Sequence, residues 1–272
     1  MIVTAEDFVP GREPGMSPAP ASFLRPDGSG VFARRASRLR RLADGHPMAG
    51  FLGFVAGLAE IQHGLTASDW REALPLILAE VAKAPATAEV ARAAHHLMAE
   101  GPDHIAGRAG RWLNGEPTTD DLAASPFIVA ALQAARIRAA ATATPLGTET
   151  DPGRCPLCGG APVAATIATQ GGIAGVRYLH CCLCATAWHL ERLRCPRCGS
   201  DGKVTFRHLD GYGVEVKAET CGDCGTYVKV FATDGHPEVE PLADDLASMA
   251  LDLHLAEDGW RRLWPNPFLH GA

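Results

Sequence analysis

The chain has 272 residues, a length that suits one or two domains with a hydrophobic core. Its 47% hydrophobic content is typical of a globular protein, and its formal charge of -6 argues against a general polyanion binder, because phosphate backbones are bound by clustered Lys and Arg. No apolar run approaches the roughly 20 residues that a membrane-spanning helix requires, so we expect no membrane insertion.

The first 30 residues predict a flexible leader. Residues 1–30 contain five prolines and several glycines, and they lack the apolar stretch of a secretory signal. The pairs Arg34-Arg35 and Arg40-Arg41 do not predict a twin-arginine export signal, because charged and polar residues interrupt the sequence that follows them. We therefore expect a cytoplasmic protein in which these arginines lie on the solvated face of a first helix.

Residues 31–142 predict an all-helical domain. The region is rich in Ala and Leu, and the run from Leu74 to Val81 shows the one-sided apolar spacing of a helix. Pro75 lies inside that run, so the third helix is expected to be kinked or to begin after Ser68. The expected helices are Phe32–Ala43, Met48–His63, Ser68–Lys83, Thr87–Ala99, Ile105–Leu113 and Ser125–Ala141.

The composition changes beyond the helical region. Residues 143–154 are polar and rich in turn formers, which is typical of a linker. Short β-type runs follow, and apolar residues then recur on one face between Leu242 and Asp258, which predicts a C-terminal helix within residues 237–272. The expected strands are Val163–Ile167, Val176–Leu179, Val204–Phe206, Val214–Val216 and Tyr227–Phe231.

All nine cysteines lie between Cys155 and Cys224. Eight of them form four Cys-x-x-Cys pairs, and the same interval of 22 residues separates the first pair from the second and the third from the fourth. In a reducing compartment such pairs are more typical of metal ligands than of disulfides. Two such turns on neighbouring hairpins supply four thiolates to one tetrahedral metal, as in zinc ribbons and rubredoxins. The predicted ligands are Cys155, Cys158, Cys181 and Cys184 in a first module, residues 155–190, and Cys195, Cys198, Cys221 and Cys224 in a second module, residues 191–236.

Three points stay open at this level. A crossed arrangement of the pairs would also give two four-cysteine sites, although equal spacing favours the sequential one. Four thiolates suit iron and zinc alike. Cys182 lies outside both predicted sites, and a small buried side chain explains it better than a reactive thiol does. Because four thiolates leave no coordination position for a substrate, and because no other catalytic motif is present, we expect a protein that is not an enzyme.

Four longer motifs lie in the metal region and the tail: Gly175–His189, Ala218–Lys229, Pro241–Ala247 and Asn266–Leu269. They resemble the formate dehydrogenase accessory protein family FdhE, closely over residues 150–270 and in helical character before that. The resemblance agrees with an α+β fold in which an N-terminal all-helical domain is followed by two tandem rubredoxin-like or zinc-ribbon modules and a C-terminal helix. It implies iron in both four-cysteine sites, with zinc as the alternative occupant.

The resemblance also implies a function. Proteins of this family are maturation factors that bind the catalytic subunit of formate dehydrogenase in the cytoplasm and assist its activation before export or assembly. The two modules would serve as a docking and redox-sensing platform, and self-association is left open. A nucleic-acid-binding zinc ribbon is the alternative function, but residues 154–240 carry nine Lys/Arg against nine Asp/Glu, so we expect no nucleic-acid partner. A dithiol oxidoreductase would need a thioredoxin-like context around one cysteine pair, which the sequence lacks.

Overall fold

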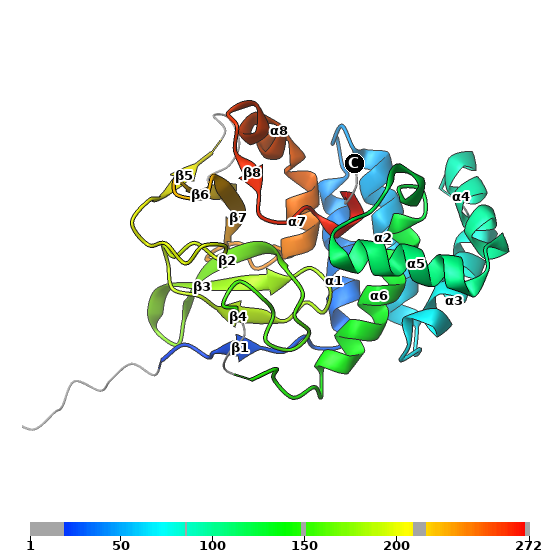
Figure 1. Ribbon diagram of the computed structural model, residues 1–272, viewed down its shortest axis with the longest axis horizontal. Helices are drawn as coiled ribbons and strands as arrows, with labels where there is room; N and C mark the ends of the chain where they lie inside the picture. Colours follow the sequence, from blue (N-terminus) through cyan, green and yellow to red (C-terminus); the bar gives the residue numbers. More distant parts are fainter. Residues whose placement is uncertain (1–18, 85, 148–150, 209–215, 270–272) are drawn as a thin grey trace, which may run out of the picture.

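The structure, a computed structural model, describes residues 19–84, 86–147, 151–208 and 216–269. Helices α1–α6 form one side of the molecule and a mixed β-sheet forms the other, with the C-terminal helices beside the junction (Figure 1). Helix α7 contacts both α1 and β2, so the end of the chain packs against both halves. This arrangement confirms the expected α+β fold and the order of its parts.

The helical domain is built around α6, whose side chains are buried almost throughout, as expected of a helix surrounded by others. Helix α3 packs beside it, and α1 pairs with α2. All six expected helices are present in the described residues, with ends within three residues of the predicted ones. Their bounds are α1 Gly30–Leu42, α2 Ala49–Gly64, α3 Trp70–Lys83, α4 Ala88–Ala99, α5 Pro102–Asn114 and α6 Ser125–Ala140.

Two helix starts show the local causes of the differences. Helix α3 begins at Trp70 because Asp69 is its N-cap, and the Asp69 carboxylate accepts a hydrogen bond from the Arg71 amide at 2.7 Å. The helix then continues through Pro75. Helix α5 begins three residues earlier than expected, because Pro102 occupies its first position, where a missing N–H group leaves no hydrogen bond unmade.

The strands of both modules form one sheet in the order β1-β4-β3-β2-β7-β6-β5, and β8 pairs with β7. Within each module the three strands are antiparallel. Strand β2 of the first module pairs in parallel with β7 of the second, with Ala165 opposite Val230, so the modules share a continuous sheet. The bounds are β1 Phe23–Leu24, β2 Pro162–Gln170, β3 Ile173–Cys181, β4 Ala187–His189, β5 Val204–Arg207, β6 Val216–Cys221, β7 Thr226–Ala232 and β8 Arg261–Arg262.

Part of the expected flexible leader is structured. Phe23 and Leu24 form β1, which pairs with Trp188 and Ala187 of β4, and α1 follows from Gly30. Residues 1–18 of the leader and most of the expected strand Val214–Val216 lie outside the described residues. Strands β1, β4 and β8 were not expected, because each is only two or three residues long and has no alternating pattern.

The C-terminal helical region expected from Leu242 to Asp258 is present, but it is not one continuous helix. The chain forms α7, Pro241–Ala247, and α8, Met249–Glu257, with a break at Ser248. The Lys229 ammonium group of β7 donates hydrogen bonds to the carbonyl oxygens of Asp245 and Ser248, at 2.8 and 3.0 Å. These carbonyls accept from a buried cation at the place where the helix is interrupted, and beyond the break Leu253 is 59% exposed.

Candidate metal centres

Each Cys-x-x-Cys pair forms the same tight turn. In three of the turns the residue after the second cysteine is a glycine in the left-handed region, at φ of 71° for Gly159, 74° for Gly199 and 68° for Gly225. The second turn uses Ala185 there instead, at φ 57°. A residue with a Cβ atom rarely adopts this backbone, which explains the glycine pattern in the sequence. The four turns therefore present their paired sulfurs in equivalent ways.

The first cluster consists of Cys155, Cys158, Cys181 and Cys184. The Sγ atoms of Cys155 and Cys184 lie 3.5 Å apart, and those of Cys158 and Cys181 lie 3.4 Å apart. Three of these side chains are buried and Cys158 is half-buried. The turns stand at the start of β2 and between β3 and β4, so one hairpin brings together residues 29 positions apart.

The second cluster consists of Cys195, Cys198, Cys221 and Cys224. Its Sγ–Sγ distances are 3.7 Å from Cys195 to Cys224 and 3.7 Å from Cys198 to Cys221. Cys195 and Cys221 are buried, Cys224 is half-buried and Cys198 is exposed. The cysteine pairs thus assemble sequentially, first with second and third with fourth, and the crossed arrangement does not occur.

The donor set fits a tetrahedral thiolate-bound metal. Metal–sulfur bonds of about 2.3 Å in a tetrahedron place the sulfurs about 3.8 Å apart, close to the observed separations. A Cβ atom on Gly160 would lie 2.9 Å from Cys181 Sγ and 3.2 Å from Cys158 Sγ, so the glycine leaves room for the cluster. Burial raises the pKa of Cys181 well above its usual range, and a bound divalent cation would offset this cost of forming the thiolate. Both clusters could hold a metal ion.

Polar groups around the sulfurs repeat between the clusters. The hydroxyl oxygen of Thr186 lies 3.1 Å from Cys184 Sγ, and that of Thr226 lies 3.0 Å from Cys224 Sγ. Burial raises the pKa of Cys224, but hydrogen bonds from Thr226, Cys195 and Cys198 together outweigh it and bring the pKa to about 7. In the first cluster the amides of Leu183 and Cys184 donate to Cys181 Sγ at 3.4 Å. Such contacts stabilise thiolates and adjust the electron density of a bound metal.

Cys182 belongs to neither cluster. Its side chain is 2% exposed and lies in the main hydrophobic core. Its amide donates to the Ala161 carbonyl at 3.0 Å, and its own carbonyl accepts from the Gln133 side chain of α6 at 2.8 Å. This environment agrees with the expected role of Cys182 as a small buried side chain. His180, which flanks the same turn, contacts the Thr166 hydroxyl at 2.8 Å and is not part of the cluster.

Two buried polar contacts around the clusters were not expected from the sequence. Gln133 accepts a hydrogen bond from Arg35 of α1 at 3.0 Å, so the helical domain is linked to the Cys181–Cys184 turn. Arg177 of β3 and Glu219 of β6 form an ion pair at 3.1 Å between the modules, with side chains 0% and 2% exposed. Burial lowers the pKa of Arg177 and raises that of Glu219, and each partner opposes the shift of the other. Isolated charged residues in strands give no sequence signal of such a pair.

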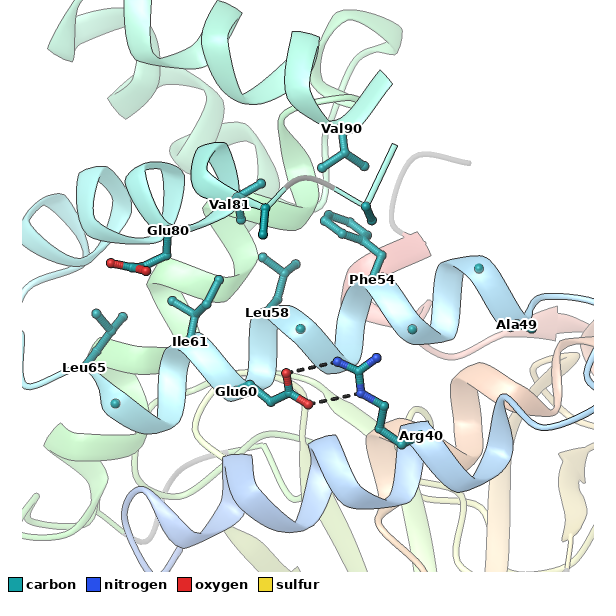
Figure 2. A pocket seen from close by; sticks show the side chains of 16 residues that line it. Arg40, Ala49, Phe54, Leu58, Glu60, Ile61, Leu65, Glu80, Val81 and Val90 are labelled. Atoms are coloured by element: carbon teal, nitrogen blue, oxygen red, sulfur yellow. Dashed lines mark hydrogen bonds and ion pairs between the residues drawn. The ribbon is translucent and has the colours of Figure 1, made fainter. Parts of the chain in front are cut away.

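The helical domain has a groove of its own. It runs along α2, has a volume of about 880 Å³ and is lined by residues between Arg40 and Val90 (Figure 2). Figure 2 shows the Arg40–Glu60 ion pair at its edge, with an N–O distance of 3.0 Å. None of its lining residues is a cysteine or belongs to the sheet, so the groove is separate from the metal centres. Among the described residues, no helix combines the length and apolar character needed to cross a membrane.

The fold and the clusters define a class of protein: a helical domain that carries two ribbon modules joined edge to edge, each with a four-cysteine centre. The sequence matches the family models "FdhE, N-terminal" over residues 20–69 and 66–146, "FdhE, central domain" over 154–192 and "FdhE, C-terminal domain" over 193–269. The chain belongs to the FdhE family.

Individual relatives agree with the family models. The chain is 32% identical over 272 residues to the Protein FdhE homolog of Pectobacterium atrosepticum, with 88% of this chain and 87% of that protein covered. It is 31% identical over 286 residues to Protein FdhE of Escherichia coli strain SE11, with 91% and 90% covered. The crystal structure of the FdhE protein from Pseudomonas aeruginosa is similar at a TM-score of 0.79 and 33% identity, with 92% of this chain and 99% of that chain covered.

Proposed function

We propose that this chain is a formate dehydrogenase accessory protein. It binds the catalytic subunit of formate dehydrogenase in the cytoplasm and assists its activation before export or assembly, without being an enzyme itself. The observation that carries this proposal is the family match, which extends from residue 20 to residue 269 and includes all four cysteine pairs.

We propose further that the eight clustered cysteines bind two metal ions, with iron as the occupant and zinc as the alternative. Iron bound by four thiolates supplies one-electron redox chemistry when present. The chain's own contribution is to bring the sulfurs together and to donate hydrogen bonds to them from Leu183 and Cys184. A four-thiolate site has no open position, which favours a docking and redox-sensing platform over hydrolysis.

Co-purification tests the proposed partner. Tagged full-length chain is expected to retain the catalytic subunit of formate dehydrogenase from a strain that accumulates its immature form. A variant with Cys198→Ser and Cys224→Ser is expected to retain less, because the second module loses its metal centre. Glu89→Gln is the control, because Glu89 lies on the surface of α4, where it forms an ion pair with Arg92. Equal recovery of the subunit from beads without the chain would contradict the proposal.

Metal analysis with an absorption spectrum tests the proposed occupant. Protein purified without oxygen is expected to contain two metal ions per chain. Iron would give thiolate-to-metal charge-transfer bands in the visible range, whereas zinc would leave the protein colourless. A colourless protein with two zinc ions would remove redox sensing from the proposal and leave the docking role.

A further inference from the structure

We infer that the two cysteine clusters have different roles. The first is a closed structural centre, whereas the second exchanges its metal and reacts through its thiolates with molecules in solution. The inference relies on the proposed function in one respect, namely that both clusters bind a metal. It goes beyond that proposal by assigning accessible chemistry to one centre only. Soft ligands, such as low-molecular-weight thiols and chelators, are the class of molecule that the second centre would accept.

The residues between the paired cysteines show the difference first. In the first cluster they include Leu157, Cys182 and Leu183, whose side chains are only 6%, 2% and 6% exposed. In the second cluster the corresponding residues include Arg197 and Asp223, which are exposed. Since the turns themselves are equivalent, the identity of these residues determines whether a turn packs against the protein or faces solvent.

The hydrophobic core encloses the first cluster. Cys155, Cys181 and Cys184 belong to the same core cluster as the buried side chains of the helices. The backbone of Gly160 lies against two of its sulfurs, and Gln133 of α6 holds the Cys182 carbonyl of its second turn. Access to the sulfurs of Cys155 and Cys184, which are 0% exposed, would require part of the core to open, which is slow in a stable domain.

The second cluster lies outside this core. Among the described residues, none of its four cysteines belongs to a hydrophobic core cluster, although Cys195 and Cys221 are only 4% and 2% exposed. Cys198 is exposed, and its neighbourhood is polar: Lys203 and Asp223 form an ion pair at 2.9 Å, with side chains 68% and 37% exposed. A thiolate at this surface can be reached without opening the protein.

Ligand exchange at the second centre follows from this exposure. Cys198 would be the ligand given up if a metal bound there exchanged: an incoming thiol would bind through its sulfur and pass its proton to the released Cys198 Sγ. In the first centre no cysteine is exposed: Cys158 is half-buried, and Cys181, which lines a pocket with Arg25 and Arg34, is only 3% exposed.

Two measurements on the full-length metal-loaded protein test the inference. EDTA is expected to remove one metal ion per chain at least about ten-fold faster than the other, the ratio that a barrier difference of about 1.4 kcal/mol produces. Limiting iodoacetamide, which forms a sulfur–carbon bond as iodide leaves, is expected to modify Cys198 and Cys224 before any cysteine of the first cluster, as mapped by mass spectrometry. Release of both metals in one phase, or first modification at Cys155, Cys158, Cys181 or Cys184, would overturn it.

Two single-cysteine variants show which cluster releases its metal in the fast phase and which in the slow phase. Cys198→Ser is expected to abolish the fast phase, to keep one slowly released metal and to change the thermal unfolding temperature little. Cys158→Ser, at the equivalent place in the first cluster, is expected to keep the fast phase and to lower the unfolding temperature clearly. The opposite assignment would overturn the inference. Protein without any metal would instead contradict the proposed metal binding, and the order of alkylation would still decide which cluster is accessible.

Discussion

Gly160 shows how a single residue makes room for a metal centre. It lies one residue beyond the left-handed Gly159, and its carbonyl accepts a hydrogen bond from the Cys155 amide at 2.9 Å. In the second cluster Ser200 makes the same bond with Cys195, at 2.7 Å. The second module therefore tolerates a side chain at this position. In the first module the sulfurs of Cys158 and Cys181 leave no space for one.

Substitution at this position should affect one centre only. Gly160→Ala would place a Cβ atom 2.9 Å from Cys181 Sγ and 3.2 Å from Cys158 Sγ, so we expect destabilisation of about 1–3 kcal/mol and loss of the slowly released metal. Gly202→Ala is the matched control, because no atom lies within 4 Å of the Cβ it would add. Chemical denaturation and metal analysis measure both effects. Full retention of two metals by Gly160→Ala would contradict the close packing.

At the scale of elements, Asp121 joins α5 to the turn before α6. Its carboxylate accepts hydrogen bonds from Arg111 at 2.7 and 2.8 Å, from Arg108 at 2.8 Å and from the Thr118 amide and hydroxyl at 2.9 Å. The bond to Arg111 is the main cause that holds the pKa of Asp121 well below its usual value, while burial opposes it. The Asp121 side chain is 2% exposed, whereas that of Arg111 is 40% exposed, so solvent screens the Asp121–Arg111 contact in part.

The lowered pKa of Asp121 predicts that the helical domain is sensitive to acid. Because the pKa is lower in the folded state, the unfolded chain binds more protons as the pH falls. The stabilisation is complete above the ordinary aspartate pKa and is lost as the pH drops below about 4. Asp121→Asn should lower the free energy of unfolding at pH 7 by about 1–3 kcal/mol and flatten its decline in acid. Thermal unfolding between pH 7 and pH 3 measures this. Parallel pH curves for the two proteins would contradict it.

The sequence predicts those elements whose signals are local. Helices α1–α6 follow from apolar spacing and breakers, and the cysteine turns follow from the x-x spacing with a glycine or a tolerated Ala185 behind it. The break at Ser248 was missed because its cause, Lys229, lies in a distant strand. The parallel pairing of β2 with β7 and the Arg177–Glu219 ion pair were missed for the same reason, since a linear pattern contains no register between remote strands.

For the whole molecule, Arg177 links the two modules. Besides its ion pair with Glu219, its guanidinium donates to the carbonyl oxygens of Glu191 and Arg194, at 3.2 and 3.0 Å, in the segment that leads to Cys195. One side chain of the first module thus holds both turns of the second cluster, through Arg194 before the first turn and Glu219 before the second. We expect the modules to unfold as one cooperative unit.

Removal of the Arg177–Glu219 ion pair should destabilise both modules. Arg177→Met leaves Glu219 buried without its partner, and we expect a loss of about 3–5 kcal/mol in stability together with weaker metal binding in the second cluster. The double variant Arg177→Met, Glu219→Leu should recover part of the stability, because no unpaired charge remains. Arg194→Met is the control, because the Arg194 side chain is 42% exposed and forms an ion pair with Glu191 rather than with Glu219. Two separate unfolding transitions in the wild-type protein would show that the modules are independent.

The short strand β1 has a consequence for solubility. The Ser22 carbonyl accepts from the His189 amide at 2.9 Å, and the Ala21 carbonyl accepts from the Tyr178 hydroxyl at 2.8 Å, so the segment covers the edge of β4. Uncovered strand edges are templates for intermolecular pairing. A chain that lacks residues 1–24 should therefore self-associate through β4 and scatter light at concentrations where the full chain stays clear. The opposite edge is β5, a four-residue strand that ends in the charged Arg207, which makes it a poor template.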